Sequence, residues 1–154
     1  VELPRDLLMG GYERTIGLLT VLDGPSAIPE PGGLQHPDDT FAWVADNHMK
    51  GISELHALTL HATATWSEQH WDTSREDTIA MLLDAARPYL GSSACVVSDV
   101  KKWRFATPIR PWPEAFVATG TLVVCGDAFA GPKVEGAAVS GLMGARHLVS
   151  LIGT

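Results

Sequence analysis

The residues best suited to chemistry lie where a Gly–Asp pair separates an apolar run from a helix that begins with small residues. Gly126 lets the chain turn sharply, and Asp127 would then project beyond the strand, where a carboxylate accepts hydrogen bonds from sugar or ribityl hydroxyls. The first helical amides, near Val134, Glu135 and Gly136, have no acceptor within the helix, and the dipole there is positive. Such an end suits a phosphate or the negative charge of a bound cofactor.

Small residues recur every fourth position in this helix, at Gly136, Ser140 and Gly144. They form a ridge almost without side chains, so another group can pack closely against it. A second interpretation stays open, in which the segment is an ordinary strand, turn and helix with a solvated Asp127 and a small packing face.

Three residues elsewhere are candidates for the substrate side of a site. Lys50, in a polar turn, would place a cation where negative charge develops. His61 lies on the polar side of an alternating strand and could line a cavity, and Trp103 could form an aromatic wall for a flat substrate. The alternatives are an exposed lysine, a structural histidine and a tryptophan packed in the core.

Metal and hydrolase chemistry fit the sequence poorly. His56 and His61 are five residues apart on one expected strand, so they point to opposite faces, and no histidine pair has the helical i, i+4 spacing of a zinc site. Ser67, His70 and Asp72 are hydrolase residue types, but the chain has no Gly-x-Ser-x-Gly turn. A turn into a capped helix explains them better.

The periodicity predicts the elements that must position these residues. Period-two or apolar runs indicate strands at 15–22, 40–45, 58–66, 94–105 and 122–125, with a Pro/Gly-rich loop at 26–39. A capping box starting at Thr73 or Ser74 begins one helix, and 134–152 forms the last. Because strands do not alternate regularly with helices, we expect an α+β fold with a mostly antiparallel sheet.

Composition narrows the function further. The chain has 154 residues, 11 Lys and Arg, and a net charge of −7, which argues against nucleic-acid binding. No run of 18 apolar residues predicts a membrane span. Cys95 and Cys125 lie in apolar runs, so we expect buried, reduced thiols and a cytoplasmic protein.

The ordered motifs resemble the renalase-like branch of the flavin-containing amine oxidases, within the FAD-dependent NAD(P)-binding oxidoreductases. The C-terminal FAD motif is matched by 125–127, Gly131, 134–137 and Ser140–Gly141. The branch's substrate-domain landmarks are matched upstream, and the likeness extends from about Tyr12 to Leu148: Trp43, Asn47, Lys50, His61–Ala62, Trp66–Ser67, His70, Lys102–Ala106 and Pro108.

The resemblance implies a flavoprotein of glutathione-reductase-like architecture that oxidises a dihydronicotinamide-type substrate with oxygen as acceptor. It assigns FAD contacts to Gly126, Asp127, Val134, Glu135 and Gly136. Lys50, His61 and Trp103 would lie on the catalytic, substrate-facing side. Two alternatives are a flavin amine oxidase, and a non-catalytic domain that keeps the fold without binding FAD alone.

One departure from the family is large, since the chain has no Gly-x-Gly-x-x-Gly motif after a strand. We therefore expect a C-terminal portion of a longer polypeptide, whose N-terminal dinucleotide-binding half is its missing partner. Residues 1–118 would form the substrate-binding domain and 119–154 the FAD-binding segment. On this view the small-residue helix face and the strand at 122–125 should be incompletely buried.

Overall fold

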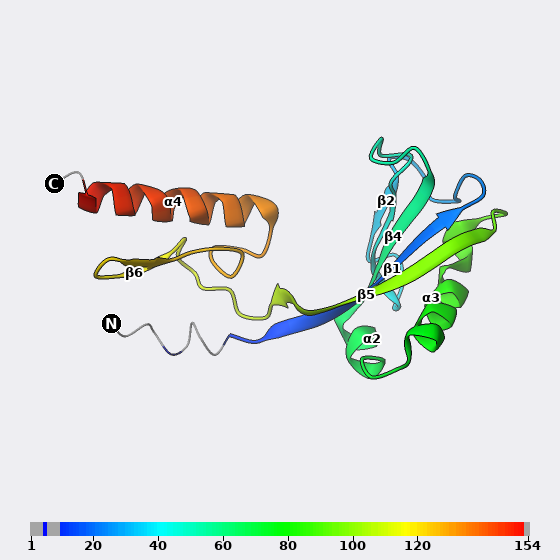
Figure 1. Ribbon diagram of the computed structural model, residues 1–154, viewed down its shortest axis with the longest axis horizontal. Coiled ribbons are helices and arrows are strands. Elements are labelled where there is room, and N and C mark those ends of the chain that lie inside the picture. Colours follow the sequence, from blue (N-terminus) through cyan, green and yellow to red (C-terminus); the bar gives the residue numbers. More distant parts are fainter. Residues whose placement is uncertain (1–4, 6–9, 153–154) are drawn as a thin grey trace. The chain divides into compact units, whose positions relative to one another are not determined.

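The computed structural model describes residue 5 and residues 10–152 (Figure 1). The described chain divides into two compact units. Residues 14–104 form the sheet unit, and residues 10–13 and 105–152 form the hairpin unit. The expected functional boundary near residue 118 stays a prediction.

A five-stranded antiparallel sheet organises the sheet unit and bears out the expected α+β class. Its strands lie in the order β2-β3-β4-β1-β5. Their bounds are Tyr12–Leu22 (β1), Gly33–Gln35 (β2), Phe41–Asp46 (β3), His56–Ala62 (β4) and Cys95–Pro108 (β5). The strand β2 falls inside the segment that we expected to be all loop, where it pairs with β3 at the sheet edge.

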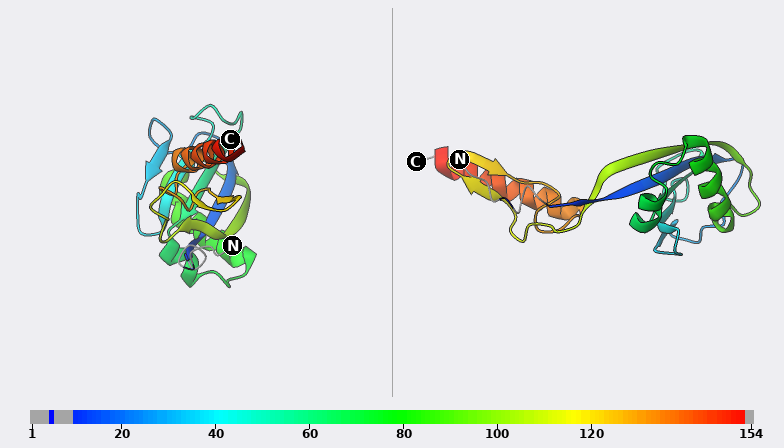
Figure 2. Two further views of the ribbon diagram at one scale, coloured as in Figure 1. Left: turned by 90° about the vertical axis from the view of Figure 1, so that its left-hand side faces the viewer. Right: turned by 90° about the horizontal axis from the view of Figure 1, so that it is seen from below.

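Two helices cover one face of this sheet (Figures 1 and 2): α2, Ala64–Gln69, and α3, Arg75–Leu90. Alternate residues of β1 and β4 point toward them, as the period-two pattern predicted, and Ile16, Leu18 and Leu60 are fully buried there. Leu82 of α3 completes the same core. Burial of each such side chain contributes about 1.5–3 kcal/mol.

The alternating run at 58–66 is not one strand, which corrects our prediction. The strand β4 ends at Ala62, and Thr63 is the N-cap of α2, where its hydroxyl accepts a hydrogen bond from the Trp66 amide at 3.3 Å. A capping hydroxyl competes with the sheet ladder for the backbone, so the chain leaves the sheet despite its alternation. Trp66 then packs against the core from the helix.

The second capping candidate begins α3. The Ser74 hydroxyl accepts a hydrogen bond from the Asp77 amide at 3.1 Å and donates one to the Asp77 carboxylate at 2.8 Å. Gly91 ends the helix with a φ of 70°, a left-handed conformation that glycine adopts without steric cost.

The hairpin unit contains a two-stranded ribbon, β6 (Val117–Thr119) and β7 (Leu122–Val124), and the helix α4, Val134–Ile152. The bounds of α4 agree with the prediction, but the small-residue face is covered, contrary to our expectation. Ser140 is fully buried, and a Cβ placed on Gly144 would lie 3.1 Å from Val123. The ribbon packs against this face, because the missing side chain of Gly144 leaves room for Val123.

Large apolar side chains of α4 are exposed instead, including Leu142, Val149 and Ile152.

The prediction of buried thiols is also wrong, since Cys95 and Cys125 are both free and exposed. Cys95 begins the edge strand β5, which has no neighbour on its outer side. None of the helices among the described residues has the length and hydrophobicity that a membrane span requires.

Candidate functional site

Ser140 ties the Gly126 turn to the middle of α4. Its hydroxyl accepts a hydrogen bond from the Gly126 amide at 2.8 Å and donates one to the Ala115 carbonyl at 2.5 Å. Gly126 has a φ of 141°, a region that residues with side chains rarely adopt. The turn that we expected from the Gly–Asp pair is therefore formed, and a buried serine holds it in place.

The first turn of α4 lies close to the backbone that precedes it. A Cβ placed on Gly136 would lie 2.3 Å from the Gly131 carbonyl oxygen, so this approach requires glycine at position 136. Ala137 donates its amide to the Lys133 carbonyl at 2.9 Å, whereas the amides of residues 134–136 donate no hydrogen bond to any described residue.

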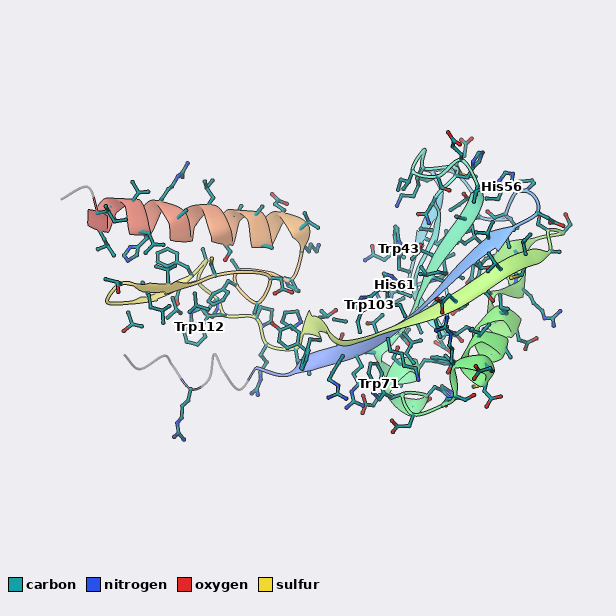
Figure 3. The ribbon with its side chains drawn as sticks, viewed as in Figure 1. Trp43, His56, His61, Trp71, Trp103 and Trp112 are labelled. Carbon is teal, nitrogen blue, oxygen red and sulfur yellow. The ribbon has the colours of Figure 1, made fainter. Side chains whose placement is uncertain are left out.

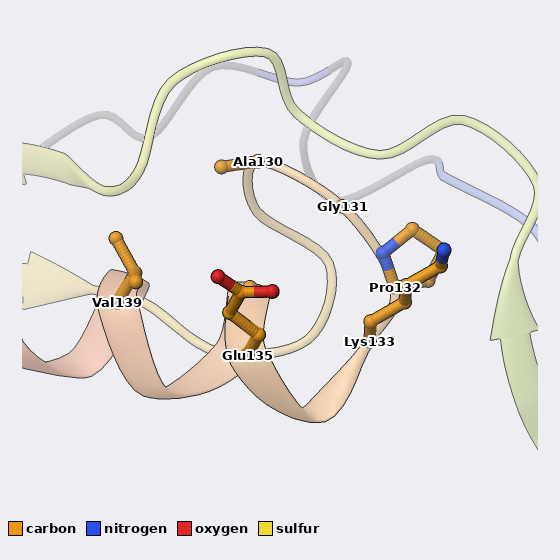
Figure 4. Close-up of a pocket in the computed structure, with 7 residues that line it drawn as sticks. Ala130, Gly131, Pro132, Lys133, Glu135 and Val139 are labelled. Carbon is orange, nitrogen blue, oxygen red and sulfur yellow. The ribbon is translucent and has the colours of Figure 1, made fainter.

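A hollow of about 410 Å³ opens beside these free amides (Figure 4). Its walls are mostly backbone and apolar atoms: Ala130, Gly131, Pro132, Lys133, Glu135, Gly136 and Val139 line it. Val134, another predicted cofactor residue, lies at the helix start with 90% of its surface exposed. The hollow thus combines positive backbone dipoles with mostly backbone and apolar walls, and Glu135 is the acidic residue in its lining.

Asp127 is exposed and lies near Tyr12. Burial raises the pKa of the Tyr12 hydroxyl, and the negative charge of Asp127 raises it further. Trp112 fixes the loop beyond Asp127, because its amide donates to Ala128 at 2.6 Å and its carbonyl accepts from Ala130 at 2.8 Å. Sequence reasoning missed this clamp, and the only signal for it was the irregular Pro111–Trp112–Pro113 stretch.

The substrate-side candidates lie on the sheet face that α2 and α3 leave open. In Figure 3, Trp43, His61 and Trp103 follow one another along this side of the sheet. Trp43 and His61 are register partners on β3 and β4, and the His61 and Trp103 rings meet edge to face at 5.3 Å between centroids. A row of aromatic rings therefore crosses the sheet.

Gly17 makes this row possible, and sequence reasoning did not identify it. It lies opposite His61 on β1, and a Cβ there would be 2.6 Å from the Trp103 ring. The indole of Trp103 thus extends from β5 across β1 to reach His61. A bare glycine in a strand is a recognisable sequence signal for such a close approach.

Lys50 and His61 bring polar groups to the open face. The Lys50 ammonium lies over the Trp43 ring, 5.5 Å from its centroid, in a cation–π contact. Burial lowers the pKa of His61, so its imidazole is neutral at neutral pH and has one donor and one acceptor nitrogen.

The predicted residues therefore form two groups, one in each unit. Lys50, His61 and Trp103 share the open sheet face, while the Gly126 and Asp127 turn and residues 134–136 share the start of α4. Across the described residues, no group of three or more His, Cys, Asp and Glu side chains is placed to hold a metal ion. No family model matches the chain.

Proposed function

We propose that this chain contributes the flavin-facing helix end and the substrate-facing sheet of an FAD-dependent oxidoreductase that resembles renalase. The observation that carries the proposal is the start of α4, where the free amides of residues 134–136 adjoin a hollow of about 410 Å³. The resemblance to the renalase-like branch assigns the FAD contacts to this same segment.

The residues at this end would bind and orient the cofactor. The amides of Val134, Glu135 and Gly136 favour negative charge on a ring that approaches the helix axis. Asp127 is exposed and able to accept hydrogen bonds from ribityl hydroxyls. A bound FAD would supply the acceptor for a hydride and pass two electrons to oxygen, which leaves as hydrogen peroxide.

The open sheet face would bind the substrate, a dihydronicotinamide-type molecule. Trp103 offers a flat apolar wall. Because His61 is neutral, its unprotonated ring nitrogen can accept a hydrogen bond from the substrate. Lys50 supplies a positive charge beside Trp43, which favours a substrate with a phosphate or carboxylate group. These residues orient the substrate, and the flavin carries the redox chemistry.

A dinucleotide-binding half of the same polypeptide is the proposed partner. The pyrophosphate of FAD is commonly held by a Gly-x-Gly-x-x-Gly loop that opens a helix, and this sequence has none. We therefore propose that the chain completes a flavin site whose pyrophosphate loop lies elsewhere in the protein.

Flavin retention tests the proposal. The product of the longest reading frame that contains this chain should purify with the absorbance of bound flavin. The Asp127→Ala variant should lose most of it, whereas Asp72→Ala, which removes an exposed carboxylate from the sheet unit, should keep it. A reading-frame product without flavin, even after incubation with FAD, would disprove the proposed function.

Peroxide release separates the enzymatic alternatives. The loaded protein should form hydrogen peroxide with dihydronicotinamide dinucleotides and not with amines. Turnover of amines alone would identify a flavin amine oxidase, and turnover of neither class would favour the non-catalytic domain.

A further inference from the structure

A second hollow, of about 250 Å³, lies on the open sheet face. We infer that it is a binding site for an uncharged aromatic ring that carries a hydroxyl or amine group. Its walls come from β1, β4, β5 and the turn after β3, and the side chains that shape it are Leu19, Val21, Asn47, Thr59, Val97 and Asp99.

The apolar walls of this hollow are unusually exposed for strand residues. Leu19, on the inner strand β1, exposes 40% of its surface, and Val97, on the edge strand β5, exposes 58%. Ala57 and Val21, which are register partners on β4 and β1, line the same hollow. A flat ring placed here would bury one of its own faces, together with the apolar side chains beneath it, away from water.

Polar groups at the rim define the chemistry of the ring's substituent. The Asn47 amide donates a hydrogen bond to the Thr59 hydroxyl at 3.0 Å, which fixes its orientation. The other atom of that amide, its side-chain oxygen, accepts no hydrogen bond from the described residues, so it can accept one from a ligand. Asp99 also lines the hollow, where it is ion-paired with Arg75, and a ligand carboxylate has no proton to donate to the Asn47 oxygen.

The strand register places this hollow next to the aromatic row. Gly17 pairs with His61, and two residues further along the same strands Leu19 pairs with Thr59. A ligand that contacts Trp103 and His61 at one end therefore meets the hollow at the other. Its role as the distal part of a substrate site rests on the proposed function, but ring binding itself needs no flavin.

Methyl NMR of the 154-residue chain tests the site directly, with benzyl alcohol as the probe. We expect saturable shifts at Leu19, Val21 and Val97, with a Kd of about 1 mM, a value typical of a ligand of this size. Phenylacetate, which replaces the hydroxymethyl group with an acetate, should bind at least threefold more weakly. The methyls of Val149 and Ile152, exposed on α4, serve as the internal control and should not shift in a saturable manner.

A matched pair of variants separates the site from general hydrophobic binding. Leu19→Glu should weaken benzyl alcohol binding at least tenfold, whereas Val96→Glu, at a more exposed β5 position outside the hollow, should not change it. Shifts that never saturate, equal shifts on α4, or unchanged binding in Leu19→Glu would overturn the inference. Loss of flavin retention in the separate absorbance test would leave ring binding intact.

Discussion

Gly17 is the residue on which the aromatic row depends most directly. Replacement by alanine places a Cβ 2.6 Å from the Trp103 ring, a distance that real structures do not allow. We expect Gly17→Ala to displace the indole, to lower the free energy of unfolding by about 1–3 kcal/mol and to change the tryptophan emission.

Gly11→Ala is the matched control for that prediction, because its Cβ meets only the flexible end of Ile109, at 3.1 Å. Urea unfolding followed by fluorescence measures both variants. If Gly17→Ala were as stable as Gly11→Ala, Trp103 would not lie across β1.

His61 predicts a pH dependence of stability. Burial lowers the pKa of His61 in the folded state, whereas its pKa in the unfolded chain is about 6.5. As the pH falls below about 6.5, the unfolded chain therefore binds a proton at His61 before the folded protein does. This contribution to stability is therefore complete above about pH 6.5 and is lost as the pH falls toward and through the lowered folded pKa. Urea unfolding between pH 7.5 and 5 should show a smaller loss of stability for His61→Gln than for the parent chain. Equal losses would contradict the prediction.

The helix α4 offers a matched glycine pair at the scale of an element. In Gly136→Ala, the new Cβ would lie 2.3 Å from the Gly131 carbonyl, and backbone cannot move away cheaply. In Gly141→Ala, the Cβ enters open space, and the helix gains about 0.5–1 kcal/mol from the lower entropy of alanine. Thermal unfolding should therefore show destabilisation by Gly136→Ala and stabilisation by Gly141→Ala. If both stabilised the protein, the close approach at the start of α4 would be wrong.

The same helix shows what the sequence alone could predict about elements. Its apolar and small residues, with Gly and Pro before it, predicted α4 between Val134 and Ile152, and the structure agrees. The sequence could not say which side of α4 is covered, because a hydrophobic stripe and a small-residue ridge both pack well. Of the β6–β7 ribbon that covers the helix, the sequence predicted β7 but not β6, since Val117–Thr119 is too short to give a periodic signal.

Local competition explains the error in β4. Alternation continued through Trp66, so the period alone extended the predicted strand. The Thr63 hydroxyl instead accepts a hydrogen bond from the amide three residues later and caps the start of α2.

For the candidate site, the sequence predicted the turn at Gly126 and the polar side of β4. It did not predict Gly17 or Trp112, whose roles depend on residues far away along the chain.

At the scale of the whole molecule, the two units differ in what holds them together. All the residues of the main hydrophobic cluster belong to the sheet unit, where they join the sheet to α2 and α3. Among the described residues of the hairpin unit, Phe129 is the one buried large apolar side chain. Local opening costs least where few apolar contacts must break, so the hairpin unit should open at lower free energy.

Hydrogen exchange measures this difference without any variant. Amides of β1 and β4 should exchange at least 100-fold more slowly than those of β7 and α4, which corresponds to a difference of about 2.7 kcal/mol in opening free energy. If the flavin proposal holds, FAD bound to the reading-frame product should slow exchange in α4 and leave β4 unchanged, because a ligand stabilises the segments it contacts. Equal protection of α4 and β4 in the 154-residue chain would contradict the ranking, and protection by FAD confined to β4 would move the proposed cofactor site away from the start of α4.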